Sequence, residues 1–457
     1  MRRNKKGLGT SILLLVILFI IVGSLYLANS PIFERIPPKI TVPNSLFWNL
    51  KQPIKVHLSD SSGIRSYRVI LNDGKSDFTV LDEKVQGLQQ EIDIFVQLPK
   101  AGWDRRTKVA TMKVIAIDGS QWNFMNGNES TKIVKIVIDS KRPQAFVLSN
   151  SYKIVKGGSA IVVFGAKDEY LDKVEIHTNF GKVFKAEPFY KDGYYVSLIA
   201  WPVTQKSFRA WVEVTDLAGN KSKAHISLYY KNHHYRYSKI NLKKRFLEGK
   251  IADLAIEFDE TANITDPLEQ FKIINETIRE KNENLIHSLS LKVSDKLIKR
   301  WSIKPFYPLK NAKKVASFGD HRFYYFNGKP VSESYHLGLD LASVKMAKIK
   351  SSNPGRVVFA GYNGIYGNMP LIDHGLGLYT LYGHCSTLLS SEGEDVTRNS
   401  VIAKTGKTGL ALGDHLHFGV IVQGVEVRPI EWMDGHWIQD NIISVMNIAR
   451  KMIDRRE

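Results

Sequence analysis

Hydrophobic and polar positions follow different periods in successive stretches of the 457-residue chain. Across residues 40–232, short runs of alternating apolar and polar positions are separated by turn residues, a pattern typical of β-strands. Residues 239–300 instead place apolar side chains at helical intervals among charged ones. From residue 304 the β-like runs return, and an amphipathic helix is predicted over residues 438–453. The pattern therefore predicts a mainly β, multidomain protein.

Two segments of the first β-rich stretch resemble each other. Residues 113–139 and 211–230 each contain a strand, a loop with an aspartate and a second, alternating strand. This self-similarity predicts tandem copies of one β-sandwich module, over residues 40–140 and 141–232. The turn Asp216–Asn220 before an alternating strand resembles bacterial immunoglobulin-like domains, which commonly act as spacers or binding arms.

The helical stretch is predicted to be a linker or hairpin, over residues 239–300, that packs on the domain after it. Within it, Thr265, Asp266 and Pro267 predict the start of a helix, because proline is tolerated in the first helical turn. The following domain, residues 304–457, is β-rich and dense in glycine, tyrosine and histidine.

The N-terminus combines a basic tail, residues 1–6, with an apolar stretch over residues 7–28. About 20 apolar residues cross a bilayer as a helix, so the stretch predicts a transmembrane helix or an uncleaved signal anchor. The basic tail then stays in the cytoplasm and the rest of the chain is exported. A cleaved signal peptide is the alternative. Pro31, directly after the small residues Ala28 and Ser30, disfavours cleavage at that point.

Charge and cysteine content narrow the range of partners. The formal net charge is +19, which favours polyanionic surroundings. Because the chain is predicted to be exported, no nucleic acid is expected as a partner, and anionic lipids or acidic wall polymers remain. Cys385 is the single cysteine, so no intrachain disulfide can form and a zinc site made of several thiolates is excluded.

Histidines and an aspartate lie on the polar faces of two predicted strands. In the segment YHLGLDLA, read as one strand, His336 and Asp340 share a face and the leucines share the other. In the segment DHLHFGV, His415 and His417 likewise alternate with apolar residues. Imidazole nitrogen and carboxylate oxygen together form a good partial ligand set for zinc.

A third segment, LYTLYGHC, places Tyr382 and His384 on one face of a predicted strand, and a glycine-rich run over residues 404–413 precedes the HLHF segment. These stretches, H-x-G-x-D-x-A, Y-x-H and G-x-H-L-H-F in this order, resemble the LytM-type (lysostaphin-like) zinc endopeptidases of peptidase family M23. The resemblance covers residues 304–437, about a third of the chain.

The resemblance to family M23 implies a site and a fold. By position, His336, Asp340 and His417 look like ligands of one Zn²⁺, and His384 and His415 look like the catalytic pair beside its open coordination position. The family fold is a small antiparallel β-sheet domain. The implied activity is that of a zinc metalloendopeptidase, and the implied substrate is peptidoglycan.

The expected function is hydrolysis of stem or cross-link peptides of the bacterial cell wall, in wall remodelling or cell-shape control. The expected location is the inner (cytoplasmic) membrane, as a single-pass protein with its bulk in the periplasm or wall, beside other envelope proteins. D,D-carboxypeptidase action on uncross-linked stems and non-catalytic activation of another hydrolase are the alternatives. Either histidine of the pair can be the general base, and the β modules can cover the cleft or target the enzyme.

Five further residues carry secondary expectations. Cys385 is predicted to be buried, and His374 is predicted to lie at a hairpin turn without binding metal. Asp414 is expected to affect substrate binding or the pKa of the histidine beside it. His321 and Tyr366 are candidates for the wall of the cleft.

Overall fold

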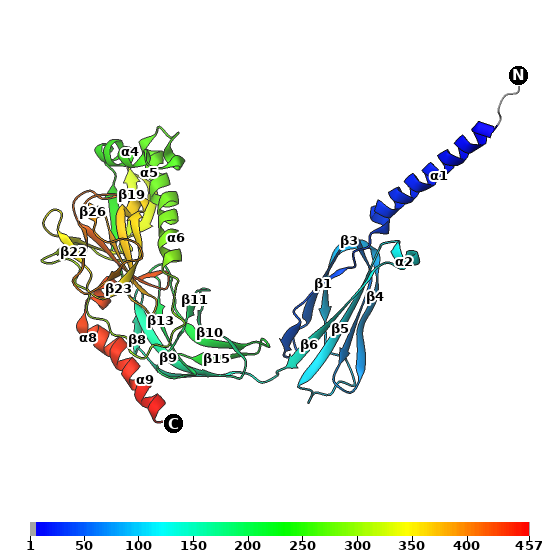
Figure 1. Cartoon of the computed structure of the whole chain (residues 1–457). Helices are drawn as coiled ribbons and strands as arrows, with labels where there is room; N and C mark the ends of the chain where they lie inside the picture. The colour runs from blue at the N-terminus through cyan, green and yellow to red at the C-terminus, as the bar shows by residue number, and fades with distance from the viewer. Residues whose placement is uncertain (1–5, 457) are drawn as a thin grey trace, which may run out of the picture. The chain divides into compact units, whose positions relative to one another are not determined.

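The computed structural model describes residues 6–456, which form two compact units (Figure 1). One unit runs to Arg142 and includes the turn Asp216–Asn220, and the other comprises Pro143–Thr215 and the chain from Lys221 onward. Of the predicted basic tail, residues 1–5 lie outside the described part.

The first unit begins with helix α1 (Lys6–Asn29), over the apolar stretch seen in the sequence. Large apolar side chains from Ile12 to Tyr26 are exposed along it. Within the residues that the structure describes, no helix is both long and apolar enough to cross a membrane. The predicted transmembrane helix is therefore not confirmed.

The first β region forms one six-stranded sheet in which β4 pairs with β3 beside the path β1-β3-β5-β6-β2. Bulges interrupt the long β3–β4 pair, as between Ser59 and Ile64, and such irregularities bend strands. The prediction of two like sandwiches is not confirmed, because here one bent sheet surrounds its own core. The elements are β1 (Lys39–Thr41), β2 (Ser45–Trp48), β3 (Ile54–Asn72), β4 (Asp77–Val96), β5 (Val109–Asp118), α2 (Trp122–Met125) and β6 (Glu129–Ile138).

The second β region consists of two four-stranded sheets, β11-β10-β14-β15 and β12-β13-β9-β7, and a parallel pair of β8 with β16. Side chains from both larger sheets contribute to one core. The strands are β7 (Gln144–Asn150), β8 (Lys153–Val155), β9 (Ser159–Lys167), β10 (Leu171–Thr178), β11 (Val183–Lys185), β12 (Glu187–Pro188), β13 (Tyr194–Ala200), β14 (Ala210–Asp216), β15 (Lys221–His225) and β16 (Tyr229–Lys231).

The two segments that resemble each other in sequence share a turn motif. The carboxylate of Asp118 accepts hydrogen bonds from the backbone and side-chain nitrogens of Asn128, at 2.8 and 2.7 Å. The carboxylate of Asp216 accepts the same two bonds from Asn220, at 2.8 and 2.9 Å. In both turns the aspartate N–H donates back to the asparagine carbonyl at 3.1 Å. The likeness between the segments thus reflects one aspartate–asparagine clamp.

The helical segment follows strand β17 (Tyr237–Asn241). The prediction of a helix start at Pro267 is confirmed, since Asp266 caps α5 by accepting a hydrogen bond from the Leu268 N–H at 3.0 Å. The helical elements are α3 (Lys244–Phe246), a π-helical turn (Leu247–Ile251), α4 (Ala252–Ala255), α5 (Pro267–Ile273), a second π-helical turn (Ile274–Ile278) and α6 (Arg279–Leu289).

The C-terminal domain is built on an eight-stranded antiparallel sheet of order β18-β21-β29-β25-β24-β23-β27, with β30 paired to β29. Smaller sheets, β17-β19-β20 and β22-β28-β26, flank it. The strands are β18 (Lys313–Ala316), β19 (His321–Phe326), β20 (Lys329–Tyr335), β21 (Leu339–Ala342), β22 (Lys348–Lys350), β23 (Gly355–Tyr362), β24 (Asn368–Asp373), β25 (Leu378–Gly383), β26 (Thr387–Leu388), β27 (Asp395–Val396), β28 (Val401–Lys404), β29 (Leu416–Val422) and β30 (Val425–Val427).

The eight-stranded sheet lies between two hydrophobic cores. On one face, Leu416 and Phe418 of β29 belong to a shared core that continues into the second β region. On the other face, Ile421 belongs to a helical core that includes Phe271 and Ile286 from the helical segment. Every residue of β29 is buried, so the predicted alternation of faces is present but both faces are covered.

The second β region and the C-terminal domain also share polar contacts. The amide of Gln423 accepts from the Lys185 N–H at 2.8 Å and donates to its carbonyl at 3.0 Å. The indole N–H of Trp432 donates to the Ser159 hydroxyl at 3.0 Å. At the C-terminus, α8 (Gly435–Ile438) and α9 (Ser444–Asp454) follow α7 (Pro429–Trp432), and α9 packs on β7 and β9 (Figure 1).

Candidate metal and catalytic site

Asp340 and His417 come together because their strands are neighbours. Strand β21 pairs antiparallel with β29, and the two residues are direct cross-strand partners. The Asp340 Oδ1 and His417 Nδ1 atoms lie 3.0 Å apart. Side chains of directly opposed residues point to the same face of a sheet, so the pairing alone aligns both groups.

His336 reaches the same point from a connection, not from a strand. The segment YHLGLDLA was predicted to be one strand, and this is wrong: β20 ends at Tyr335 and β21 begins at Leu339, in a different sheet. The backbone of His336 bonds Asp320 and Gly319 instead, at 3.0 and 2.7 Å. Gly338 permits the crossing, because a Cβ there would collide with the ring of His417.

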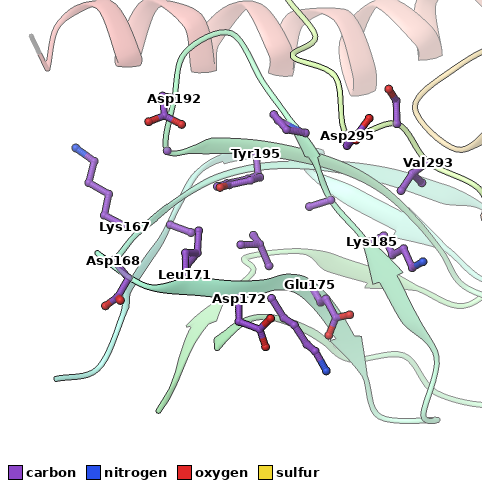
Figure 2. A pocket seen from close by; sticks show the side chains of 17 residues that line it. Lys167, Asp168, Leu171, Asp172, Glu175, Lys185, Asp192, Tyr195, Val293 and Asp295 are labelled. Carbon is purple, nitrogen blue, oxygen red and sulfur yellow. The ribbon is translucent and has the colours of Figure 1, made fainter. Parts of the chain in front are cut away.

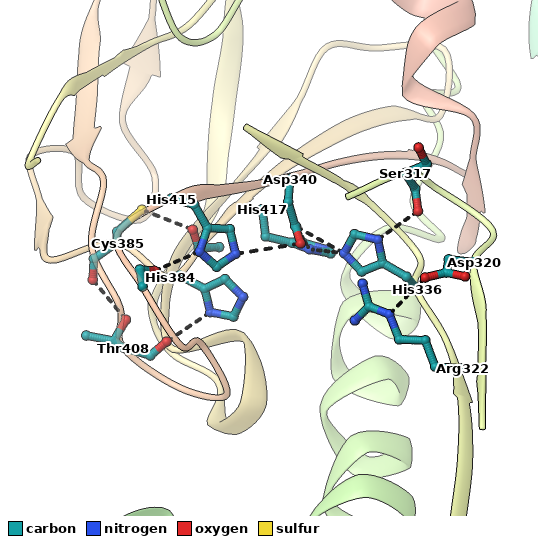
Figure 3. A network of polar contacts seen from close by, with 12 residues as sticks. Ser317, Asp320, Arg322, His336, Asp340, His384, Cys385, Thr408, His415 and His417 are labelled. Atoms are coloured by element: carbon teal, nitrogen blue, oxygen red, sulfur yellow. Dashed lines mark hydrogen bonds and ion pairs between the residues drawn. The ribbon is translucent and has the colours of Figure 1, made fainter. Parts of the chain in front are cut away.

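The three groups form a compact set of electron-pair donors (Figure 3). The Nδ1–H of His336 donates to the Ser317 carbonyl at 2.9 Å, which leaves the lone pair on Nε2. That Nε2 lies 3.0 Å from Asp340 Oδ1 and 3.2 Å from His417 Nδ1. Ligands of tetrahedral zinc at 2.0–2.1 Å lie about 3.3 Å from one another, so the separations fit one zinc ion. Two imidazoles and one carboxylate also match the donor types zinc prefers.

Burial and neighbouring rings set the charges of these groups. Burial opposes ionisation of Asp340, but His336 and His417 hold the pKa of its carboxyl well below the usual value. Burial lowers the pKa of His417, against the opposing effect of Asp340. The site therefore contains a carboxylate beside an imidazole that burial keeps neutral, which is the protonation state that metal binding requires.

His384 enters the site through an unusual backbone conformation. Strand β25 ends at Gly383, the cross-strand partner of His417, and His384 follows with a φ of 62°, in the left-handed region. The prediction that Tyr382 and His384 share a face is therefore wrong. Tyr382 packs against Phe418 in the shared core, with ring centroids 5.5 Å apart, whereas the left-handed residue turns its imidazole to the cleft. Strained backbone of this kind is common at functional sites.

His415 and His384 stand side by side at the edge of the donor set (Figure 3). Their ring centroids are 4.8 Å apart. The Nδ1–H of His384 donates to the Thr408 carbonyl at 2.9 Å, and the Nδ1–H of His415 donates to the Gly413 carbonyl at 2.8 Å. Each ring thus keeps Nε2 for the cleft, and the Nε2 of His415 lies 3.7 Å from Asp340 Oδ2.

The two rings sit in different surroundings. Burial, reinforced by the charges of His417 and His415, lowers the pKa of His384 to about 3. His384 is therefore neutral at neutral pH and offers a lone pair at Nε2. His415 has no backbone strain and lies in a loop before β29, where its amide bonds the Gly406 carbonyl at 3.0 Å.

A groove of about 1140 Å³ contains all five residues. Tyr366 lies in its lining, as expected from the sequence, with its ring edge-on to His417 at a centroid distance of 5.5 Å. His321 does not line this groove: it stacks on Tyr335 at 4.1 Å and contacts Glu333.

The other residues singled out in the sequence have structural roles. His374 bonds the Pro354 carbonyl and the Thr380 hydroxyl, both at 2.7 Å, and burial lowers its pKa to about 4. Cys385 is buried, as predicted, which raises the pKa of its thiol to about 12. The carboxylate of Asp414 accepts from Thr405 and from the Met346 amide, so it holds the loop.

Sequence reasoning missed the backbone carbonyls that orient the imidazoles. The acceptors for His336, His384 and His415 are the carbonyls of Ser317, Thr408 and Gly413. A carbonyl carries no residue-specific signal, so no sequence pattern could identify these partners. Arg322, beside the site, was also missed, although the sequence places it two residues after Asp320, the carboxylate that it contacts.

The antiparallel sheet and the donor set define a candidate metal site with two further histidines beside it. Residues 334–429 match the model of peptidase family M23, so the C-terminal part of the chain contains an M23 peptidase domain. All five site residues lie within this match.

Curated relatives align with part of the chain. A DD-carboxypeptidase/endopeptidase, Mpg, of Neisseria meningitidis serogroup B is 37% identical over 95 residues, 21% of this chain and 22% of that protein. The peptidoglycan DD-endopeptidase ShyA of Vibrio cholerae is 30% identical over 151 residues, 33% of this chain and 34% of that protein. The murein hydrolase activator NlpD of Salmonella dublin is 35% identical over 104 residues, which are 22% of this chain and 27% of that protein. The chain thus spans only a fifth to a third of the length of these relatives.

Proposed function

We propose that this protein is a zinc-dependent endopeptidase that hydrolyses stem or cross-link peptide bonds of bacterial peptidoglycan. The observation that carries the proposal is the convergence of His336, Asp340 and His417 beside two imidazoles with free Nε2 atoms. The names of two relatives support this substrate class: Mpg is a DD-carboxypeptidase/endopeptidase and ShyA is a peptidoglycan DD-endopeptidase.

In this proposal His336, Asp340 and His417 hold the ion, and the paired histidines act on water and substrate. When bound, Zn²⁺ supplies Lewis acidity, which lowers the pKa of water and polarises a carbonyl. Neutral His384 accepts a hydrogen bond at Nε2 and orients the attacking water. Because burial lowers the pKa of His384 to about 3, that ring is a weak base, and the proposal gives proton transfer to His415. The Nε2 of His415 faces the cleft, where it takes up the proton and delivers it to the leaving amine.

The N-terminal part is proposed to hold the enzyme at its substrate. The apolar side chains of α1 would anchor the chain in the inner membrane, with the remainder in the periplasm or wall, and the first β region would act as a spacer. Peptidoglycan and other envelope proteins are the proposed partners.

The test is digestion of purified peptidoglycan by the purified full chain, with products resolved by mass spectrometry. Loss of cross-linked dimers in favour of monomers is expected, and a chelator should abolish it until Zn²⁺ is restored. His417→Ala should lose both bound zinc and activity. His415→Ala should keep bound zinc but lower kcat about 10²- to 10⁴-fold, the usual contribution of an acid–base group.

Other outcomes would replace the proposal. Shortened stems without loss of cross-links would establish a carboxypeptidase. The chain would instead be an activator, as the name of NlpD describes that relative, if it digested nothing and if the chain and His417→Ala equally accelerated an added wall amidase.

A further inference from the structure

One wall of the groove comes from outside the matched peptidase residues. Strand β17 adds to β19 in parallel, with Lys239 opposite Phe323, and its alternate residues Tyr237, Lys239 and Asn241 form the exposed face. The chain then continues through Lys243 and Arg245 at the start of the helical segment. These residues line the same groove as the five site residues.

This wall is strongly cationic. The lining of the groove contains seven lysine and arginine side chains and three carboxylates, one of which is the candidate ligand Asp340. By contrast, the hollow between strands of the second β region contains three lysines and five carboxylates (Figure 2). The excess of positive charge is therefore specific to the groove and does not simply follow from the overall charge of the chain.

Five of the seven cations form no ion pair among the described residues, and three of these five, Lys239, Lys243 and Arg245, lie on the wall formed by β17 and the start of the helical segment. Within residues 6–456, no carboxylate forms an ion pair with Lys239, Lys243 or Arg245, although Lys244 next to them pairs with Glu248. Side chains of this kind add to the local potential without being neutralised, and a groove concentrates that potential on what enters it.

Arg322 is a fourth cation, and it is held in place. Its Nε atom contacts the Asp320 carboxylate at 3.3 Å, and Asp320 in turn accepts from the Ser238 hydroxyl at 2.7 Å. The terminal amino groups of Arg322 have no hydrogen-bond partner among the described residues. Figure 3 shows the pair next to His336, whose amide bonds the Asp320 carbonyl. A fixed guanidinium with free amino groups suits bidentate binding of a carboxylate.

We propose that Lys239, Lys243, Arg245 and Arg322 form a carboxylate-binding subsite that selects acidic peptides for the groove. The inference rests on the proposed peptidase function, because it assigns the free carboxylates of the substrate peptide to this wall. The fixed Arg322 binds one carboxylate beside the reacting centre, and the three unpaired cations attract the remaining negative charge.

The test compares one peptide in two forms, a cross-linked stem-peptide dimer with free carboxylates and the same dimer with those groups amidated. The full chain is compared with Lys239→Gln/Lys243→Gln/Arg245→Gln and with Arg322→Gln. The matched control is Lys296→Gln/Lys299→Gln/Arg300→Gln, which removes the same charge from exposed positions outside the groove.

The triple variant should raise the KM for the free-acid dimer about tenfold at low salt. The kcat for that dimer, and the KM for the amidated dimer, should change little. The Arg322 variant should behave alike, and Arg322→Lys should restore part of the affinity. The control should match the unmodified chain. Equal KM values for the two dimers, or equal effects of the groove and control variants, would overturn the subsite while leaving the peptidase function intact.

A second readout separates the two proposals. Binding of the free-acid dimer to His415→Ala is measured by calorimetry at increasing salt, so it needs no turnover. Salt-sensitive binding that the groove variants weaken would uphold the subsite even if the chain cut nothing. Binding insensitive to salt and to the variants would overturn it.

Discussion

The two β regions of this chain use similar strands in different ways. The first, from β1 to β6, surrounds a core made of its own residues, including Trp48, Leu58 and Val114. The second, from β7 to β16, contributes Phe164 and Leu198 to a core that also contains Trp432 and Phe418 of the peptidase domain. Both regions contain the same aspartate–asparagine clamp, so a shared local motif does not determine whether a region folds alone.

The peptidase domain therefore extends beyond its recognisable motifs. The residues that match family M23 begin at 334. The hydrophobic core under the sheet that bears the site nevertheless includes side chains from residue 148 onward. The second β region therefore acts as part of the scaffold. The first region is a separate unit, and its removal should not disturb the site.

Deletion gives the largest expected effect. Removal of residues 143–232 should prevent folding of the peptidase domain, because it exposes one face of the shared core to water. Removal of residues 1–142 should leave peptidase unfolding and peptide cleavage unchanged. Soluble yield, circular dichroism and cleavage of wall peptides measure the effect of each deletion. A folded, active protein without residues 143–232 would show that the second β region is not part of the scaffold.

Replacement of one buried tryptophan in each of the two units tests whether the units are independent. Trp432→Ala should destabilise the peptidase unit by about 3–5 kcal/mol, because a fully buried indole leaves a cavity. Trp103→Ala, which removes a ring packed on Phe78 at 5.6 Å, should affect the first unit alone and spare activity. Denaturant unfolding with an activity assay at each step distinguishes them, and loss of activity in both would show that the units are coupled.

The pH dependence of stability tests Glu431, a buried acid where the second β region meets the peptidase domain. Burial raises the pKa of Glu431 to about 7, against the effects of Arg428 and the Ser159 amide. The folded state therefore binds more protons than the unfolded state between pH 4.5 and 7, and stability falls by at most about 3 kcal/mol as pH rises through that window. Glu431→Gln should flatten this fall while keeping an acceptor for the Ser159 N–H. An unchanged slope in urea titrations would contradict the assignment.

The smallest effect is expected from the polar contacts. Gln423→Ala should cost about 1–3 kcal/mol of peptidase stability, because the Lys185 backbone loses both partners. Asn128→Ala is the counterpart in the first region, where it breaks the clamp on Asp118. Each variant should shift the thermal transition of its own unit only, as followed by calorimetry.

The residue types of the site were readable from sequence, but the backbone that presents them was not. The alternation around His417 predicted its face correctly, because β29 is a regular strand. The same logic failed at His384, where one left-handed residue reverses the side-chain direction, and at His336, where the chain crosses between two sheets. Period-two reasoning assumes continuous extended backbone, and these two positions break that condition.

Long-range packing was also beyond the sequence. Strands β9 and β13 are almost wholly buried, and part of what covers their core comes from the peptidase domain, which no local pattern indicates. The cationic groove wall places residues near 240 beside His336, through the parallel pairing of β17 with β19 and the contacts of Asp320 with Ser238 and His336. Local patterns identify which side chains are buried, whereas partner choice depends on contacts far apart in the chain.

The burial of β29 on both faces bears on how the site would hold the proposed ion over time. An amide in a strand covered by two cores exchanges its hydrogen with solvent only when the unit unfolds globally. His417 is thus attached to the slowest-exchanging part of the domain. His336 lies in a connection, where local opening is easier. Release of a bound ion should therefore begin at His336, and its rate should follow fluctuations of that connection and not the lifetime of the fold.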